Sequence, residues 1–206
     1  YNNTELWNGS NWTEVNNLNT ARGSAYGAGA DNTSALFFGG LADPAVPGIE
    51  TELWNGTNWT EVNDLNTARG QMGGAGTAPA ALCYGGGPSG SLKSVTESWN
   101  GTNWTEVNDL NTARYYIGGA GTQTAALAIG GDTNPPSGAS LSITEDWNGV
   151  SWVEVADLNT DRDGAGSDGT TSAAFIASGR TGVPSAVTSA AEEWSGSSTT
   201  IKVLTD

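Results

Sequence analysis

The chain has 206 residues, with 22 acidic residues, seven Lys and Arg residues and no His, which gives a formal net charge of −15. This balance argues against nucleic acid and anionic membrane surfaces as partners, because both need a basic footprint. The lack of His removes the Ser-His-Asp and Cys-His catalytic sets and the usual ligands of zinc, copper and haem. We therefore expect no catalytic residues, no metal and no cofactor.

Cys83 is the only cysteine, so no disulfide can form within the chain. No apolar run reaches the ~18 residues that indicate a transmembrane helix, and no signal peptide is visible. These features favour neither an oxidising nor a reducing compartment.

A motif of the form Glu-x-Trp-Asn/Ser-Gly recurs at intervals of 45 to 48 residues, and in four of its five copies a second Trp follows five residues later. A repeat of this length predicts one supersecondary unit copied several times. The motif contains every Trp of the chain: Trp7, Trp12, Trp54, Trp59, Trp99, Trp104, Trp147, Trp152 and Trp194.

In chain order, the first predicted element is a hairpin of two Trp-bearing strands over about residues 4–16. Four complete sets of four strands then follow, starting near Ser24, Gly70, Tyr115 and Asp163. The last copy is eroded and is typical of a C-terminal cap.

One copy illustrates the elements of a set. Residues 94–99 and 104–107 alternate between polar and apolar and are expected to be strands, joined by a turn at Asn100–Asn103. A polar connection with one apolar anchor, Leu110, leads to two further strands rich in Gly and Ala. The second of these ends at Gly130-Gly131, and a loop of variable length follows.

Four short strands per repeat, without a helical period, predict the blade of an all-β β-propeller. The Gly/Ala strand suits the innermost position, where blades crowd around the axis. The two Trp strands suit the outer positions, where we expect all nine Trp to fill the gaps between sheets and to dominate the stability.

A paired Gly ends the second strand of three copies, an aromatic follows some fifteen residues later, a Trp comes next, and an Arg opens the next copy. In these features the sequence resembles the kelch-repeat β-propellers. It departs from them in the Trp that replaces a customary Tyr, in a shorter hairpin, and in the last copy, which has Ser178-Gly179 and carries Thr199 at the second Trp position. The paired glycines are Gly39, Gly40, Gly85, Gly86, Gly130 and Gly131.

The near-identical, Asn- and Thr-rich copies are also similar to the kelch-like arrays of marine bacteriophage tail proteins and other virion-associated proteins. This resemblance implies a location at a virion or extracellular surface.

We expect a single domain over residues 1–206, with about 18 strands and five blade positions, one of them incomplete. The alternative is four blades plus an extra N-terminal hairpin. In either case a homo-oligomer, or contact with other virion proteins, is expected to involve the unpaired half-blade. The repeats span about residues 4–50, 51–95, 96–143, 144–187 and, in part, 188–206.

Four arginines occupy one repeat position: Arg22, Arg69, Arg114 and Arg162. They could form a ring that binds a ligand. The alternative is structural, with each Arg fastening the turn into the next blade to carbonyls or to a repeated Glu at 52, 97 or 145. The near-invariance of the position favours the structural role.

Repeated carboxylates could act as acid and base, as in glycosidases, but no copy carries a distinctive pair, and strand alternation places one set at the solvent side. Asp161, Asp163 and Asp168 could hold Ca²⁺, yet the spacing matches no Ca²⁺ loop. The repeated carboxylates considered are Glu5, Glu14, Glu61, Glu106 and Glu154.

The copies differ mainly in the loop between the second and third strands, at residues 41–48, 87–93, 132–141 and 180–186. These loops emerge on one face, as a recognition surface would, although drift in unconstrained loops gives the same pattern. We expect a non-enzymatic interaction module that binds protein or glycan there, with a carbohydrate-binding propeller as the alternative and a propeller enzyme as a third hypothesis. The candidate loop residues are Asp43, Pro88, Lys93, Asp132, Pro135 and Arg180.

Overall fold

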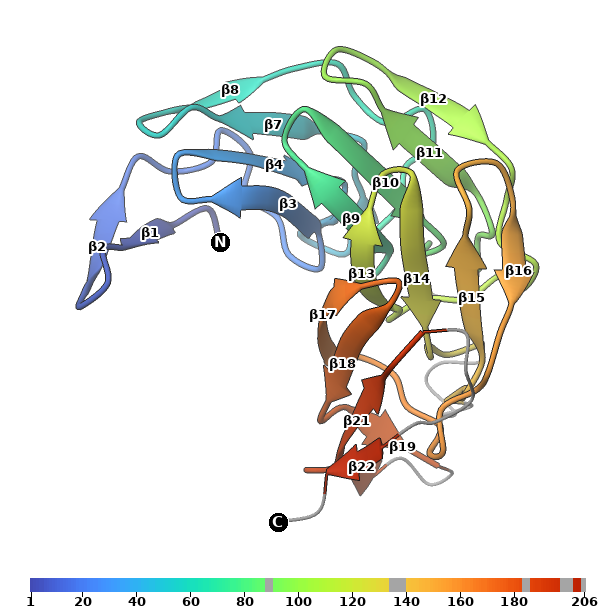
Figure 1. The fold of residues 1–206 in the computed structure, drawn as a ribbon. Coiled ribbons are helices and arrows are strands. Elements are labelled where there is room, and N and C mark those ends of the chain that lie inside the picture. Colours follow the sequence, from blue (N-terminus) through green and yellow to red (C-terminus); the bar gives the residue numbers. More distant parts are fainter. Residues whose placement is uncertain (88–90, 134–139, 183–185, 197–201, 205–206) are drawn as a thin grey trace.

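A computed structural model describes residues 1–87, 91–133, 140–182, 186–196 and 202–204. Figure 1 shows antiparallel sheets arranged around a common axis. Four of these sheets have four strands each and form the blades of a β-propeller. The expectation of an all-β propeller is confirmed.

Each blade runs outward from the axis in sequence order, and we number the blades from the N-terminus. Blade 1 contains β3 (Tyr26–Asp31), β4 (Ser34–Phe38), β7 (Thr51–Trp54) and β8 (Trp59–Glu61). Blade 2 contains β9 (Gly73–Thr77), β10 (Ala80–Tyr84), β11 (Thr96–Trp99) and β12 (Trp104–Val107). Blade 3 contains β13 (Gly118–Thr122), β14 (Ala125–Ile129), β15 (Thr144–Trp147) and β16 (Trp152–Glu154). Blade 4 contains β17 (Gly166–Thr170), β18 (Ala173–Ala177), β21 (Ala191–Trp194) and β22 (Lys202–Leu204).

A separate hairpin precedes the blades. It consists of β1 (Thr4–Trp7) and β2 (Trp12–Val15), which form a two-stranded sheet of their own. The structure thus has four complete blades plus an N-terminal hairpin, and the blades and hairpin together match the expected eighteen strands. In Figure 1 the hairpin and blade 4 lie at the two ends of the arc of sheets.

The innermost strands are the Gly/Ala-rich ones, as predicted. A Cβ on Gly74 would lie 2.6 Å from the ring of Tyr26, and one on Gly119 would lie 2.1 Å from the Gly74 carbonyl oxygen. Such distances leave room only for hydrogen, so neighbouring blades pack backbone against backbone. The hydroxyl of Tyr84 crosses this contact and lies 2.8 Å from the Leu127 carbonyl oxygen in the next blade.

A series of main-chain hydrogen bonds connects neighbouring blades just before their inner strands. The amide of Gln71 donates to the Ser24 carbonyl at 2.8 Å, Tyr116 donates to Gln71 at 2.8 Å, and Gly164 donates to Tyr116 at 3.0 Å. All four residues have φ between 52° and 61°. Because of this left-handed kink, each inner strand begins two or three residues after its predicted start.

The turn between the two outer strands has the predicted chemistry. The side-chain oxygen of Asn100 accepts hydrogen bonds from the amides of Thr102 and Asn103 at 3.0 and 2.9 Å. Gly101 has a φ of 90°, which glycine adopts without steric cost. The Trp pair flanking the turn, Trp99 and Trp104, lies directly opposite in register.

The expectation that all nine Trp are buried is wrong for the first two. Trp99 is 1% exposed, whereas Trp7 is 43% and Trp12 is 65% exposed. The reason is that, among the described residues, the hairpin has no inner strands beside it and no blade beyond it. Trp54, Trp104, Trp147 and Trp152 are also buried, and Trp59 and Trp194 are half-buried.

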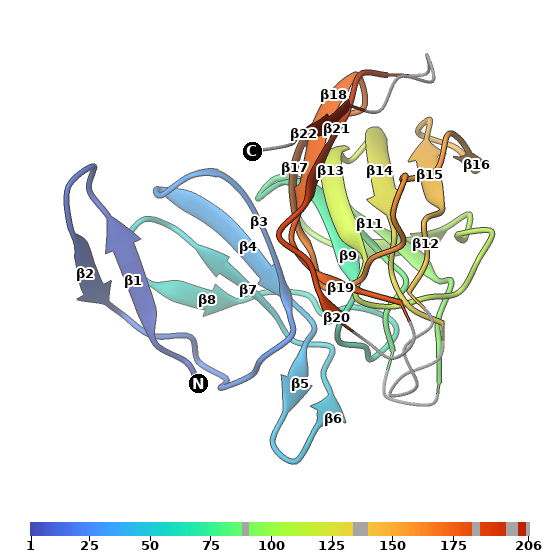
Figure 2. The same cartoon turned by 90° about the horizontal axis from the view of Figure 1, so that it is seen from below.

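Two of the variable loops contain short hairpins that the sequence did not predict. These are β5 (Leu41–Ala42) with β6 (Val46–Pro47), and β19 (Arg180–Thr181) with β20 (Ala186–Val187). In Figure 2 both project from the same side of the disc. We call this side the loop face, made of residues 41–48, 91–93, 132–133, 140–141, 180–182 and 186.

The C-terminal copy supplies the outer strands β21 and β22 of blade 4, so it completes a blade. Thr199 lies outside the described residues. Within the described part of the chain, no helix is long and apolar enough to cross a membrane.

Candidate functional site

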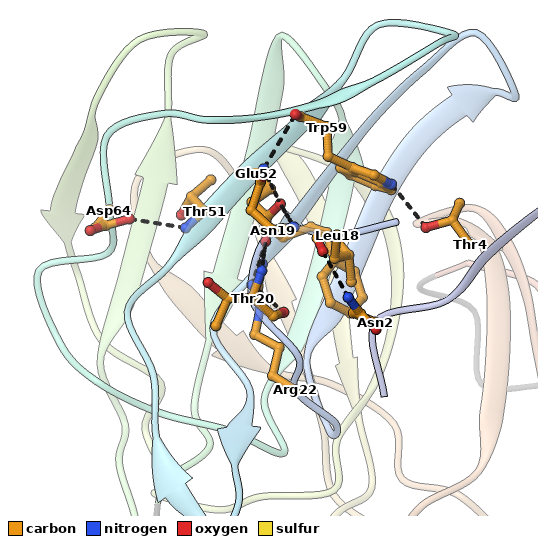
Figure 3. Close-up of polar contacts among 11 residues, drawn as sticks. Asn2, Thr4, Leu18, Asn19, Thr20, Arg22, Thr51, Glu52, Trp59 and Asp64 are labelled. Carbon is orange, nitrogen blue, oxygen red and sulfur yellow. Dashed lines mark hydrogen bonds and ion pairs between the residues drawn. The ribbon is translucent and has the colours of Figure 1, made fainter. Parts of the chain in front are cut away.

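The repeated arginines lie in buried ion pairs. Figure 3 shows the first: the Glu52 carboxylate accepts from Arg22 at 2.6 Å, from the amide of Asn19 at 2.7 Å and from the Asn19 side chain at 2.8 Å. The amide of Thr20 adds a fourth contact at 3.3 Å. A segment of sequence Asn-Thr-x-Arg therefore encloses one carboxylate from the third strand of the blade that it leads into. We call this arrangement the Asn-Thr-x-Arg clamp.

Burial raises the pKa of Glu52, but the hydrogen bonds from Asn19 and Arg22 and the charge of Arg22 outweigh it, so the pKa lies below its usual value. An ionised, hydrogen-bonded carboxylate next to a buried guanidinium is a structural element, because neither group is open to a ligand.

The clamp occurs four times. Arg69 binds Glu97 at 2.8 Å, Arg114 binds Glu145, and Arg162 binds Glu192 at 2.6 Å. In all four pairs the Arg and Glu side chains are at most 2% exposed. The hypothesis of an open ligand-binding ring of arginines is wrong for this reason. Matching Asn residues complete the clamps: Asn66, Asn111 and Asn159.

Glu192 was missed as a partner of Arg162. Its sequence context is altered, because Ala191 replaces the Thr that precedes Glu52, Glu97 and Glu145. The signal was nevertheless present, since all these Glu residues lie two positions before the first Trp of their copy.

The paired glycines meet the clamp from the preceding blade. Gly85 and Gly86 have φ of 65° and 83°, and the amide of Gly86 donates to the Arg114 carbonyl at 2.9 Å. A Cβ on Gly85 would lie 2.7 Å from that carbonyl oxygen. Gly39-Gly40 and Gly130-Gly131 are arranged in the same way against Arg69 and Arg162.

Among the candidate carboxylates, Glu5 and Glu14 lie directly opposite each other in the hairpin, and the Asp residues have separate partners. Glu14, Glu61, Glu106 and Glu154 are exposed at the rim of the disc, as predicted. Asp161 accepts from the amide of Gly182 at 3.0 Å, Asp163 binds Arg180, and Asp168 lines the axial cavity. Among the described residues, no group of three or more His, Cys, Asp or Glu side chains could hold a metal ion.

The axial cavity has a volume of about 120 Å³ and lies between the four inner strands. Its walls are mostly Gly and Ala, with Tyr26, Ser167 and Asp168 as polar side chains. Burial, followed by the negative charge of Asp168, raises the pKa of Tyr26 to about 12. The phenol is therefore neutral at physiological pH and offers a hydrogen bond rather than a base.

Cys83 lies on β10 and is fully buried. Burial raises the pKa of its thiol to about 12, with Arg69 lowering it and Glu97 raising it to smaller extents. A thiol in this state behaves as a small apolar side chain rather than as a nucleophile.

One cluster on the loop face breaks the repeat pattern. The Arg180 guanidinium lies 4.7 Å from the centre of the Tyr116 ring and donates from Nε to Asp163 at 2.8 Å. Ser140 donates to the other Asp163 oxygen at 2.8 Å, and Gln71 donates to the Tyr116 hydroxyl at 2.7 Å. Three blades thus contribute to one aromatic and charged surface.

An open depression of about 460 Å³ adjoins this cluster, lined by Tyr116, Gly164, Ser178, Gly179, Arg180 and Val187. The Arg180 side chain is 43% exposed, although Asp163 beneath it is buried. Its hydrogen bond to Asp163, opposed by partial burial, raises the pKa of Arg180. The positive charge is therefore permanent and held in place by a buried partner.

The other candidate loop residues lie apart from the cluster or outside the described residues. Asp43 is exposed on the β5–β6 turn, Lys93 is half-buried, and Asp132 is buried and forms main-chain bridges to Tyr115 and Ser140. Pro88 and Pro135 lie outside the described residues. Of the six candidates, Arg180 therefore has the clearest local geometry for binding.

Fold and sites together define a repeat β-propeller of four blades, held by buried clamps and carrying a variable loop face. Comparison with known proteins finds no matching family model and no matching curated protein. The assignment to this class therefore rests on the repeats and the architecture.

Proposed function

We propose that this propeller is a non-enzymatic interaction module that presents its loop face to a protein or glycan. The proposal rests on which segments of the sequence differ between the repeat copies. The clamp recurs in all four blades, and the paired glycines and the Trp turn recur in blades 1 to 3, whereas the loop-face segments differ in length and sequence. A binding surface on a rigid scaffold has this pattern.

The Arg180 cluster is the best-defined part of the loop face. It combines a fixed cation, an aromatic ring and hydroxyl groups beside an open depression. Aromatic and Arg side chains are enriched where proteins bind partners. We place the partner's contact there.

We further propose that the protein is a kelch-like propeller and that it lies at a virion or other extracellular surface. The paired glycines and repeated Arg of the kelch pattern support the first part, and the similarity of the Asn- and Thr-rich copies to phage arrays supports the second. A net charge of −15 favours solubility in such an exposed setting.

The test uses photo-crosslinking from two matched valines. A photoreactive amino acid replaces Val187, beside the Arg180 cluster and 87% exposed, or Val153, on the outer strand and 52% exposed. In the native host assembly, we expect a discrete adduct from position 187 that Arg180→Ala removes. Equal products from both positions, or none from position 187 together with no ligand on a glycan array, would contradict the proposal.

A carbohydrate-binding propeller remains the second candidate, because Trp7 and Trp12 are exposed. They border a groove of about 330 Å³ that also contains Asp31, Asn32 and Trp54. Exposed aromatic faces of this kind are platforms on which sugars stack. On a glycan array, loss of signal with Trp12→Ala but not with Arg180→Ala would favour this function over the loop face.

A further inference from the structure

The N-terminal hairpin has an open strand edge. In all four blades the third strand pairs on both sides, as β11 does with β10 and β12. The equivalent strand β1 pairs with β2 alone among the described residues. The main-chain groups on its other side therefore form a template for an additional strand.

The hairpin nevertheless stands in a regular blade position. The indole N–H of Trp59 donates to the Thr4 hydroxyl at 2.9 Å, as Trp104 does to Thr51 at 3.0 Å. Asn16 binds the blade 1 turn at Thr57 and Asn58 in the way that Asn63 binds the blade 2 turn. The hairpin is thus docked like the outer half of a blade whose inner half is missing.

Trp7 shows what the missing half would supply. The first Trp of every other copy donates its indole N–H to a carbonyl in the turn between the inner strands of its own blade. The acceptors are Asn32 for Trp54, Ala78 for Trp99, Gln123 for Trp147 and Thr171 for Trp194, at 2.8 to 3.0 Å. No described residue accepts from the indole of Trp7.

Glu5 is the fifth member of the clamped Glu series, two positions before Trp7. Glu52, Glu97, Glu145 and Glu192 are at most 2% exposed, whereas Glu5 is exposed and no Asn-Thr-x-Arg segment contacts it within the described chain. A free strand edge, an unpartnered indole and an unclamped carboxylate therefore coincide at one position.

One contiguous segment of the repeat would pair with the free strand edge, accept a hydrogen bond from the Trp7 indole and bind the Glu5 carboxylate. In each blade the Asn-Thr-x-Arg clamp leads directly into the two inner strands, which end at the paired glycines or at Ser178-Gly179. All four clamps of the chain are occupied by their own blades, so a second copy has none to offer while it remains folded. The occupant must therefore be a separate segment of the same repeat type.

We propose that the hairpin is a docking site for such a segment. An Asn-Thr-x-Arg sequence would clamp Glu5, and its following Gly- and Ala-rich strand pair would extend the sheet at β1, as in β-strand addition. The charges are complementary, because the equivalent segment in this chain, residues 110–131, contains one Arg and no acidic residue. This interaction surface is distinct from the loop face.

The test adds a synthetic peptide with the sequence of residues 110–131 to the 206-residue protein. Hydrogen–deuterium exchange and calorimetry are the readouts. We expect saturable binding, with slower exchange at residues 4–7 and unchanged exchange in the outer strands of blades 2 and 3. Glu5→Gln and a peptide with Arg114→Ala should each weaken binding by about tenfold or more, because each leaves a charged group unpaired.

Glu14→Gln is the matched control, because Glu14 lies directly opposite Glu5 in the hairpin register and belongs to no clamp position. Its affinity for the peptide should equal that of the wild type. Absence of protection at residues 4–7 under saturating peptide, or equal losses from Glu5→Gln and Glu14→Gln, would overturn the proposal. So would a doubled molar mass that the peptide cannot reverse, since a second copy would then cover the edge.

Discussion

The carbonyl oxygen of Arg114 accepts a hydrogen bond from the amide of Gly86, 2.9 Å away in the preceding blade. The guanidinium of the same Arg114 binds Glu145 in its own blade. One residue thus joins two blades, through its main chain on one side and its side chain on the other. The repetition of Arg and Gly-Gly at fixed spacing follows from this double contact.

The buried ion pairs make each clamp sensitive to the loss of one partner. Arg69→Met leaves the Glu97 carboxylate buried without its counter-charge, and we expect a loss of about 3–5 kcal/mol in the free energy of unfolding. The double variant Arg69→Met with Glu97→Leu should recover part of that loss, because no charge is left buried. Urea denaturation gives both values, and equal stability of the single and double variants would contradict this account.

Gly85→Ala tests the contact between paired glycines and the next clamp. The new Cβ would lie 2.7 Å from the Arg114 carbonyl oxygen and 2.4 Å from Cδ1 of Ile117, at a φ of 65°. We expect a loss of about 2–4 kcal/mol in thermal or urea unfolding.

The control is Ser178→Gly at the equivalent position of blade 4, where φ is 64° and Ser178 is exposed. No further clamp packs against Ser178 within the described residues, so a side chain fits. Removing it should change stability by no more than about 1 kcal/mol. A loss comparable to that of Gly85→Ala would show that the paired positions matter for another reason.

The lowered pKa of Glu52 predicts that the free energy of unfolding depends on pH in the acid range. Its folded pKa lies below its unfolded value of 4.5, so its contribution to stability is complete above about pH 4.5 and disappears as the pH falls through the folded pKa. Glu52→Gln should destabilise the protein strongly at pH 7, and the difference from wild type should shrink below pH 4.5. A constant difference from pH 7 to pH 3, measured by urea unfolding, would be inconsistent with an ionised Glu52.

The unequal burial of the Trp residues predicts unequal costs of truncation. Trp104 is buried and its ring centre lies 4.8 Å from that of Phe38 in the neighbouring blade, so Trp104→Ala should cost about 3–5 kcal/mol. Trp12→Ala should cost less than about 1 kcal/mol, because Trp12 is 65% exposed. Similar costs for the two variants would mean that the hairpin is covered in solution.

The repeat pattern predicted most of the fold because its signals are local. Strand alternation, the Asn-Gly turn and the Gly/Ala strand each depend on residues within one copy. Four copies therefore predict the same strands independently. The pairing of Arg22, Arg69 and Arg114 with the three repeated Glu residues was among the sequence hypotheses for the same reason. The short hairpins β5–β6 and β19–β20 were not predicted, because they lie where the copies disagree.

The sequence by itself determined the class of fold, the order of strands and the residues that hold each blade, because those depend on contacts repeated at a fixed spacing. Only the tertiary structure decided what lies beside each copy. It showed that Arg180 stacks on Tyr116 and binds Asp163, and that Glu5, Trp7 and Trp12 are exposed while their repeat equivalents are mostly buried. Such differences arise between residues far apart in the chain, where identical motifs acquire different neighbours and therefore different burial.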